Sequence, residues 1–245
     1  MQPIRVWLTP PGPNPWKVVF ILEELGIPYE VKSIRFEDVK KPPMIDVNPN
    51  GRVPAIEDLN TNLTLWESGA IITYLIEQYD TKHTLTYTSL ADKHHLNQWL
   101  HFQMSGQGPY YGTSGWFIYL HPEKVPSAID RYTKQVTRVL GEWLVGDKMT
   151  YADLAWVPWN DRVDSSLVGV PEHEKLDAFP NVKAWHERMT SRASWQRSMV
   201  LRAKLMDEQG LLPNGMPKGA MPEGIESYSD YVAQVNAGEN PVFEQ

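Results

Sequence analysis

Residues 48–54 have the sequence Asn48-Pro-Asn-Gly-Arg-Val-Pro54 and lie inside an alternating pattern of strand and helix signals. Gly51 permits a tight turn there, and Pro54 opens a short strand. If the Val53–Pro54 bond is cis, the turn leaves the backbone of Val53 unpaired, so that a peptide could bind to it as an added strand. A plain turn before an edge strand is the alternative interpretation.

The sequence on both sides of this turn predicts a small mixed sheet covered by helices. Helices are expected from Asn14 onward and over residues 68–79, and strands over residues 4–8, 29–34, 55–57 and 63–66. Asn14 as N-cap, Pro15 as the first helical residue and Gly26 just past the end form a start and stop signature for the first helix. The resulting order is βαβ(α)ββα.

The rest of the chain shows no strand pattern. Thr150 and Asp153 form a predicted capping box, and seven of the ten Trp lie between residues 89 and 205. Residues 206–245 carry 1 basic and 7 acidic side chains, a charge of −6, together with many Pro and Gly. The expected organisation is a first domain over 1–80, a linker over 81–88, an all-helical domain over 89–205 and an acidic tail over 206–245.

The composition excludes several classes of protein. The 245 residues include no Cys, which excludes disulfides, thiolate metal sites and a protein thiol nucleophile. The net charge of −7 argues against nucleic-acid binding, and no apolar run reaches the roughly 20 residues of a membrane span. The N-terminus lacks a signal-peptide pattern, so a cytoplasmic protein that binds neither nucleic acid nor membrane is expected. The adjacent His94 and His95 point apart on a helix, so no metal site is expected.

Two predicted helix N-termini are candidate sites for charged groups. Asn14 is an ordinary N-cap on local sequence, but the outward N–H groups of such a terminus also stabilise a thiolate, and the side-chain amide can donate to it. Ser68 is likewise an ordinary N-cap. The same terminus could instead bind a carboxylate, with Glu67 pairing an adjacent ammonium. A carboxylate and an ammonium on one carbon are the head group of an α-amino acid.

In combination these motifs resemble those of the cytosolic glutathione transferases. The segments Asn14-Pro-Trp-Lys, Trp66-Glu-Ser-Gly-Ala-Ile and Trp143-Leu-Val-Gly-Asp-Lys-Met-Thr-Tyr-Ala-Asp-Leu-Ala are similar to a fungal branch related to the prion-forming yeast nitrogen-catabolite regulator, with the bacterial nu class as cousins. The resemblance covers about residues 4–205. It implies an α+β two-domain homodimer, with a thioredoxin-like βαβαββα N-domain and an all-α C-domain. It also implies a cis bond before Pro54.

The resemblance implies that Asn14 is the catalytic residue and contacts the glutathione sulfur, with glutathione as co-substrate and no metal. The other glutathione-binding residues that it implies are Val53 and Pro54 for the cysteinyl backbone, Glu67 and Ser68 for the γ-glutamyl head, and Lys40 and Arg52 for carboxylates. Two features depart from the family pattern. Thr9 is the only hydroxyl near Asn14, which would therefore act by hydrogen bonding rather than as a base. The segment 138–143 is also shorter than in relatives by roughly three helical turns.

The second substrate of this fold is expected between the domains. The glycine-rich segment 104–118 is unusual for a helix interior, and four of its aromatic residues are expected to line an apolar acceptor pocket: Tyr110, Tyr111, Trp116 and Phe117. Ordinary core packing is the alternative for each. Trp156 and Trp159, which follow the capping box, are expected in the core.

The expected function is that of a glutathione transferase that stabilises the glutathione thiolate at a helix N-terminus and directs it at a small apolar electrophile or at a glutathione disulfide. Because the protein has no Cys, disulfide exchange would run through two glutathione thiols. One alternative is a non-catalytic regulatory or interaction protein. Another is a glutathione-dependent isomerase or carbon–sulfur bond-forming enzyme of fungal secondary metabolism. The role of the tail stays open.

Overall fold

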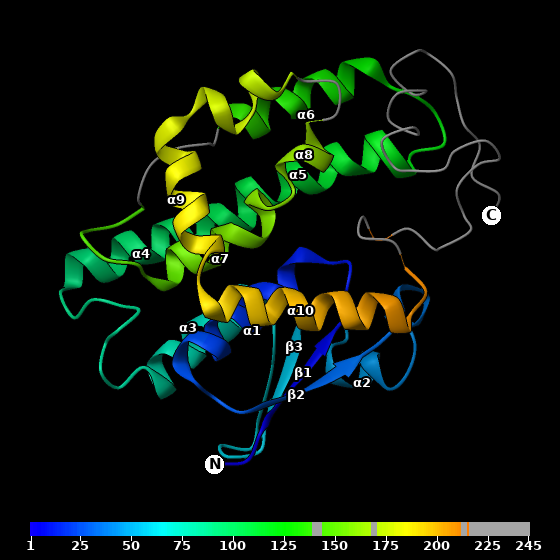
Figure 1. Cartoon of the computed structure of the whole chain (residues 1–245). Coiled ribbons are helices and arrows are strands. Elements are labelled where there is room, and N and C mark those ends of the chain that lie inside the picture. Colours follow the sequence, from blue (N-terminus) through cyan, green and yellow to red (C-terminus); the bar gives the residue numbers. More distant parts are fainter. Residues whose placement is uncertain (139–143, 168–170, 212–214, 216–245) are drawn as a thin grey trace.

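The N-terminal part of the chain folds around a four-stranded mixed sheet. The computed structural model describes residues 1–138, 144–167, 171–211 and 215 (Figure 1). The elements of the N-terminal domain are β1 (Ile4–Leu8), α1 (Pro13–Leu25), β2 (Tyr29–Ser33), a 3-10 turn (Phe36–Asp38), α2 (Met44–Val47), β3 (Ala55–Asp58), β4 (Leu63–Trp66) and α3 (Ser68–Tyr79). The strand order is β2-β1-β3-β4, with β1 parallel to β2 and β3 antiparallel to β1 and β4. The expected βαβαββα order is confirmed.

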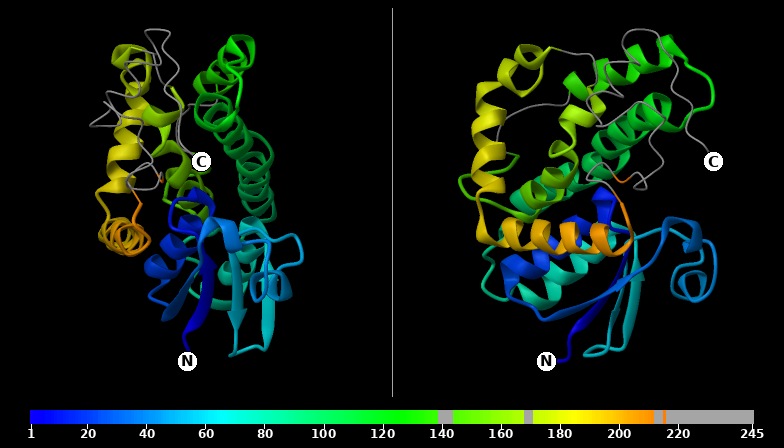
Figure 2. Two further views of the ribbon diagram at one scale, coloured as in Figure 1. Left: turned by 90° about the vertical axis from the view of Figure 1, so that its right-hand side faces the viewer. Right: turned by 45° about the vertical axis from the view of Figure 1, so that its right-hand side comes forward.

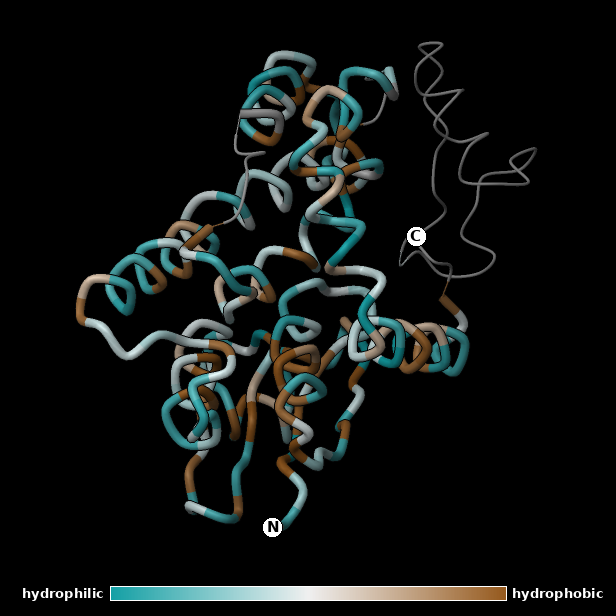
Figure 3. The backbone as a smooth tube through the Cα atoms, turned by 60° about the vertical axis from the view of Figure 1, so that its left-hand side comes forward, coloured by the Kyte–Doolittle hydropathy of each residue, from teal (hydrophilic) through white to brown (hydrophobic). Residues whose placement is uncertain are grey.

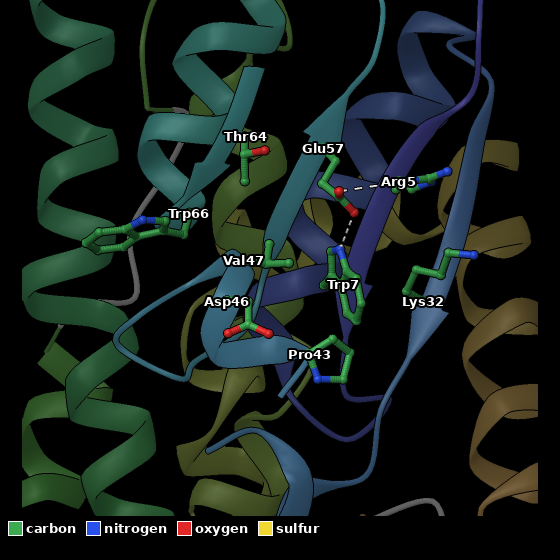
Figure 4. A pocket seen from close by; sticks show the side chains of 9 residues that line it. All are labelled: Arg5, Trp7, Lys32, Pro43, Asp46, Val47, Glu57, Thr64 and Trp66. Atoms are coloured by element: carbon green, nitrogen blue, oxygen red, sulfur yellow. Dashed lines mark hydrogen bonds and ion pairs between the residues drawn. The ribbon is translucent and has the colours of Figure 1, made fainter. Parts of the chain in front are cut away.

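The two faces of this sheet have different surroundings, because successive side chains of a strand point to opposite sides. Ile4, Val6 and Leu8 of β1 are buried and pack with apolar residues of α1 and α3. Arg5 and Trp7 point to the opposite face, which faces the short helix α2 (Figure 4). The apolar core of the domain therefore lies between the sheet and the pair α1 and α3.

The C-terminal domain is built from helices, as expected from the sequence. Its elements are α4 (Leu90–Phe102), a π-helical turn η2 (Gln103–Gln107), α5 (Gly108–Gly115), a second π-helical turn η3 (Trp116–Leu120), α6 (Pro126–Arg138), α7 (Tyr151–Asn160), α8 (Val163–Ser166), two 3-10 turns (Glu172–Glu174 and Leu176–Ala178), α9 (Pro180–Thr190) and α10 (Ala193–Glu208). Residues 206–208, which the sequence places in the tail, thus belong to α10. Residues 139–143 of the expected short segment 138–143, and residues 212–214 and 216–245 of the tail, lie outside the described residues.

The predicted capping box at the start of α7 is confirmed. The backbone N–H of Thr150 donates to the Asp153 carboxylate at 2.9 Å, and both residues are buried. The indole N–H of Trp185 donates to the second carboxylate oxygen at 3.2 Å. Burial raises the pKa of Asp153 above its ordinary value, and these hydrogen bonds offset that rise only in part. This network fixes where α7 begins, and α7 packs against α1.

The last helix, α10, returns to the N-terminal domain and packs beside α1 (Figures 1 and 2). Figure 3 shows hydrophobic residues distributed among hydrophilic ones along this helix. The hydrophobic residues can therefore face the core on one side of it. Trp195 packs against Phe20 of α1 with 5.2 Å between ring centroids. Arg192 forms a bidentate ion pair with Glu24, with 2.7 Å from Nε to Oε1 and 2.8 Å from Nη2 to Oε2. These contacts bind the two domains together.

We expect Glu24→Gln to lower the free energy of unfolding by about 1–2 kcal/mol, because it removes the charge that Arg192 pairs with. Burial alone would raise the pKa of Glu24, but hydrogen bonds from Arg192 and Ser194 and the nearby arginine charges hold it below its ordinary value. The stabilisation is therefore present above that ordinary value and is lost as the pH falls through the folded-state pKa. Urea unfolding at neutral and acidic pH measures both effects.

The matched control is Glu37→Gln, because Glu37 forms an exposed ion pair with Arg35 at 3.8 Å. It should change the free energy of unfolding by less than about 0.5 kcal/mol. Equal losses from the two variants at neutral pH would show that the Glu24 pair does not hold the domains together.

Candidate active site

Three connecting segments meet at one end of the sheet. The antiparallel pairing places Trp7 beside Ala55, and Ala55 beside Trp66. The end of β1, the start of β3 and the end of β4 therefore lie side by side. The loop leading to Asn14 follows β1, the turn containing Val53 precedes β3, and the start of α3 follows β4. The sheet thus brings together segments that are far apart in the sequence.

Helix α1 begins two residues earlier than expected. Its N-cap is Gly12, and Asn14 is the second helical residue rather than the cap. The expectation that Asn14 caps the helix is therefore wrong, because Pro13 as well as Pro15 fits the first turn. Prolines have no N–H, so Asn14 supplies the one backbone N–H among the first three helical residues. The backbone offers fewer donors to an anion here than an ordinary helix would, which leaves a larger share to the side-chain amide of Asn14.

The loop before Asn14 is held by hydrogen bonds to its carbonyl groups. The Pro10 oxygen accepts from the Trp16 indole at 2.9 Å and from the Arg202 guanidinium at 3.3 Å. Arg162 donates to the oxygen of Pro11. Arg202 and Arg162 belong to the helical domain, so that domain helps to set the position of the loop.

Thr9, the nearby hydroxyl, is only 3% exposed. Its Oγ1 lies beside the backbone of Gly12, 3.3 Å from where a Cβ atom at that residue would be. A thiol activator has to be able to reach the sulfur of a bound ligand. The burial of Thr9 leaves the side chain of Asn14, which is half-buried, as the better placed polar group.

The side-chain amide of Asn14 bonds to the helical domain. The indole N–H of Trp159, in the last turn of α7, donates to Asn14 Oδ1 at 2.9 Å. Among the described residues, the Asn14 side chain makes this one hydrogen bond, and the amide nitrogen of Asn14 donates to none of them. The amide nitrogen is therefore free to donate to a ligand.

The turn 48–54 is organised by one buried side chain. The amide of Asn48 donates to the oxygen of Arg52 at 2.8 Å and accepts from the N–H of Asn50 at 2.9 Å. Gly51 has a φ of 57°, which favours glycine, and a Cβ there would lie 2.8 Å from the oxygen of Val39. The predicted cis bond between Val53 and Pro54 is confirmed.

The groups that this turn offers to a ligand are of two kinds. In the described residues, neither the N–H nor the C=O of Val53 takes part in a hydrogen bond, so both are available to an extended peptide. Arg52 is exposed, and Lys40 is exposed with its ammonium bonded to the oxygen of Asn50 at 2.6 Å. Both cations therefore stand at the rim of the turn, where a carboxylate could reach them.

The start of α3 has an unusual backbone. Glu67 occupies the N-cap position with a φ of 68°, and its side chain is exposed. A non-glycine residue in this conformation stores strain, and such positions gather at functional sites. Ser68 is the first helical residue rather than the cap, and it is buried. Its Oγ accepts a hydrogen bond of 3.3 Å from Lys17.

Lys17 is a fully buried amine beside this helix start. It lies on α1 three residues after Asn14, and its ammonium also donates to Gln103 of the helical domain. Burial lowers the pKa of Lys17 to about 7, although the nearby charge of Glu67 raises it. Lys17 therefore joins α1 and the start of α3 to the helical domain.

The structure separates the four aromatic residues expected to line an acceptor pocket. Tyr111 is 1% exposed and donates to Asn160 at 3.1 Å, so it belongs to the core. Tyr110 is half-buried on α5. Trp116 is exposed and Phe117 stacks on Tyr132, both in the second π-helical turn. Burial removes Tyr111 from the expected pocket, whereas Tyr110, Trp116 and Phe117 stay candidates for it.

A surface cavity of about 690 Å³ lies on the face of the sheet away from α1 (Figure 4). Its lining comes from β1, β2, β3, β4 and the α2 region: Arg5, Trp7, Lys32, Pro43, Asp46, Val47, Glu57, Thr64 and Trp66. Glu57 links two of the strands by accepting from the Trp7 indole at 2.8 Å. This cavity therefore does not include Asn14. Among the described residues, no helix is long and apolar enough to cross a membrane, and no group of three potential metal ligands is found.

Two residues at the site were missed by the sequence reasoning. Lys17 is the one cation in the apolar first helix, which was a signal of burial with a specific partner. Trp159 was assigned to the core, whereas it is half-buried and bonds to Asn14. The signal for it was the pair Gly108 and Gly112, spaced so that both lie on one side of a helix and leave room for a large ring.

Comparison with known proteins agrees with this architecture. The glutathione S-transferase N-terminal domain model matches residues 11–78, and the glutathione S-transferase C-terminal domain model matches residues 121–193. The chain is 47% identical over 210 residues to the glutathione S-transferase-like protein gedE of Aspergillus terreus, covering 78% of this chain and 92% of that protein. A thioredoxin-like domain joined to an all-helical domain, with these matches, defines the class, and the chain belongs to the glutathione S-transferase family.

The fungal branch expected from the sequence is also confirmed. The glutathione transferase URE2P6 of Phanerochaete chrysosporium, solved in complex with oxidized glutathione, superposes with a TM-score of 0.77 at 40% identity, covering 82% of this chain and 97% of that one. The transcriptional regulator URE2 of Saccharomyces cerevisiae is 36% identical over 228 residues, covering 74% of this chain and 63% of that protein. The chain is thus similar both to a transferase and to a regulator.

Proposed function

We propose that the protein binds glutathione at the Asn14 end of the sheet and stabilises its thiolate for attack on a small electrophile. The observation that carries this proposal is the meeting of the Asn14 loop, the Val53 turn and the start of α3 at one end of the sheet. In this arrangement Val53 pairs with the cysteinyl backbone, and Glu67 and the start of α3 bind the γ-glutamyl head. The other carboxylate of glutathione then lies near Arg52 and Lys40.

The chemistry follows from the donors around Asn14. Its side-chain amide and its backbone N–H hydrogen-bond the sulfur and favour the thiolate over the thiol. A pKa lowered by two units corresponds to about 2.7 kcal/mol. The thiolate attacks an electrophilic carbon, a carbon–sulfur bond forms, and the leaving group departs with the bonding electrons. With a mixed disulfide of glutathione, the thiolate attacks the glutathione sulfur, glutathione disulfide forms, and the other sulfur leaves as a thiolate, so no protein Cys is needed.

The charge of Glu67 tests this assignment. We expect Glu67→Gln to weaken glutathione binding by about tenfold, because the ammonium of the γ-glutamyl head loses its partner. Isothermal titration with glutathione measures the change. Glu77→Gln is the matched control, since Glu77 is exposed on the same helix and away from its start. It should leave the affinity within about twofold of the wild type.

This titration distinguishes an error in the role of Glu67 from an error in the proposed function. Equal affinities for the wild type and Glu67→Gln would remove Glu67 from the site. A wild-type protein that binds no glutathione would overturn the enzymatic proposal as a whole. The substrate class is tested with 1-chloro-2,4-dinitrobenzene as an electrophilic carbon and with mixed disulfides of glutathione as disulfide substrates.

A non-catalytic regulatory protein is the second candidate function. It is favoured by the similarity to the transcriptional regulator URE2 and by the burial of Thr9, the hydroxyl nearest to Asn14. Tight binding of glutathione without turnover of either substrate would support it. Both candidates share the expectation of a homodimer, and sedimentation measures that directly.

A further inference from the structure

The indole of Trp159 is held in place by the helical domain. A Cβ atom at Gly108 would lie 3.2 Å from Trp159 Nε1, and one at Gly112 would lie 3.3 Å from Cη2. Tyr111 packs edge to face on the ring, with 6.1 Å between centroids and an angle of 62°. Protein interiors are close-packed, so these neighbours fix where the indole N–H points. It points out of the helical domain toward Asn14.

The chemistry of an indole decides how the Asn14 amide is turned. An indole nitrogen can only donate, so the group it contacts has to be the oxygen of the amide and not its nitrogen. The distance of 2.9 Å between Trp159 Nε1 and Asn14 Oδ1 fits this arrangement. The NH₂ group of Asn14 is then directed away from Trp159. Without that donor, packing alone would hardly distinguish the two orientations of the amide, because its oxygen and its NH₂ group are nearly equal in size and shape.

The backbone around Asn14 leaves little other freedom. The carbonyl groups of Pro10 and Pro11 are held by Trp16, Arg202 and Arg162. Pro13 and Pro15 restrict φ on both sides of Asn14. Rotation of the side chain is therefore the main way in which the donor and acceptor atoms of Asn14 can change place.

We propose that Trp159 is a positioning residue that turns the amide nitrogen of Asn14 toward the glutathione sulfur. This inference rests on the proposed function, because it assigns Trp159 a role in the stabilisation of the thiolate. The residue acts across the domain boundary, from the last turn of α7 to the first turn of α1. The helical domain thereby contributes to activation of the thiol.

Trp159→Phe is the first test, because it keeps an aromatic ring and removes the N–H donor. We expect the pKa of the bound glutathione thiol to rise by about half a unit to one unit. The kcat/KM for 1-chloro-2,4-dinitrobenzene should fall about three- to tenfold below that pKa and recover above it, where the thiol ionises unaided. The affinity for S-methylglutathione, which has no thiol, should stay within about twofold. A residue that merely supports the fold would not produce this pH dependence.

Trp156→Phe is the matched control, since Trp156 lies on the same helix and donates to the oxygen of Trp99 at 3.3 Å. It should leave the thiol pKa unchanged. Gly112→Ala is a second variant that keeps the indole N–H but presses on the ring, and Ala favours the helix. It should shift the thiol pKa in the same direction by a smaller amount. This variant also gives a result if Trp159→Phe fails to fold.

A double-mutant comparison separates this inference from the proposed function. In an Asn14→Ala protein, Trp159→Phe should add less than about a twofold further loss of kcat/KM, because the group it orients is gone. If Asn14→Ala raises the thiol pKa but neither Trp159→Phe nor Gly112→Ala does, this inference is wrong and the proposed function stands. If the wild type binds glutathione without lowering its thiol pKa, both are wrong.

Discussion

Asn14→Asp should lower kcat/KM for 1-chloro-2,4-dinitrobenzene by about a hundredfold or more at a pH below the wild-type thiol pKa. The change is nearly isosteric, but a carboxylate accepts hydrogen bonds where the amide nitrogen donates one, and it repels a thiolate. Removal of one donor from a developing anion costs about 10²–10³ in rate in comparable sites. Trp159 keeps an acceptor for its indole N–H, so the helix start is expected to retain its position. Steady-state kinetics over a range of pH measure the loss.

Asn14→Ala provides the comparison for this variant. It removes the amide nitrogen that donates to the sulfur and also the oxygen that accepts from Trp159. We expect kcat/KM to fall by a smaller factor of about ten to a hundred, since no repelling charge is introduced. Binding of S-methylglutathione should be nearly the same in all three proteins, because a thioether carries no negative charge. If Asn14→Asp is as active as the wild type, donation by the Asn14 side chain is not part of the reaction.

The second large effect concerns the stability of the protein as a function of pH. Burial lowers the pKa of Lys17 in the folded chain from the ordinary lysine value of 10.5, which the unfolded chain is expected to keep, to about 7. Below about pH 7 both states hold the proton, and the folded state carries a penalty of about 5 kcal/mol for the buried ammonium. Between the two values the unfolded state binds more protons, so the free energy of unfolding rises with pH. Between these two pKa values, the free energy of unfolding of the wild type should therefore rise relative to that of Lys17→Met by about 1.4 kcal/mol per pH unit.

Urea unfolding between about pH 7 and about pH 9 measures this difference. Protein concentrations are kept equal, because an expected dimer makes stability depend on concentration. Lys93→Met is the control, since Lys93 is exposed on α4 and should leave the pH dependence of the wild type unchanged. Parallel stability curves for the wild type and Lys17→Met would show that Lys17 keeps an ordinary pKa in the folded protein.

Local sequence predicts the elements of the N-terminal domain well. The bounds of β1, β4 and α3 agree with the expected ranges, because alternation and helical spacing are set by neighbouring residues. The start of α1 was misplaced because two prolines lie in its first turn and either one can take the first helical position. That shift changed the chemistry expected for Asn14. The role of the backbone N–H groups became smaller, and the role of the side-chain amide became larger.

The remaining features of the site depend on contacts between distant segments. The bond from Trp159 to Asn14 joins residues 145 positions apart. No local pattern specifies such a pair. The aromatic residues after Met104 follow a π-helical turn, which adds a residue to a helical turn and changes the direction of every later side chain. Tyr111 points into the core, although its place in the glycine-rich segment 104–118 made it a candidate for the acceptor pocket.

The central claim is that the Asn14 amide lowers the pKa of the glutathione thiol, and titration of that thiol on the protein tests it most directly. The ultraviolet absorbance of the thiolate, followed against pH in the wild-type complex, should show a pKa about one to two units below that of free glutathione. In the Asn14→Asp complex the pKa should return to the free value or exceed it. The same lowered pKa in both complexes would contradict the claim.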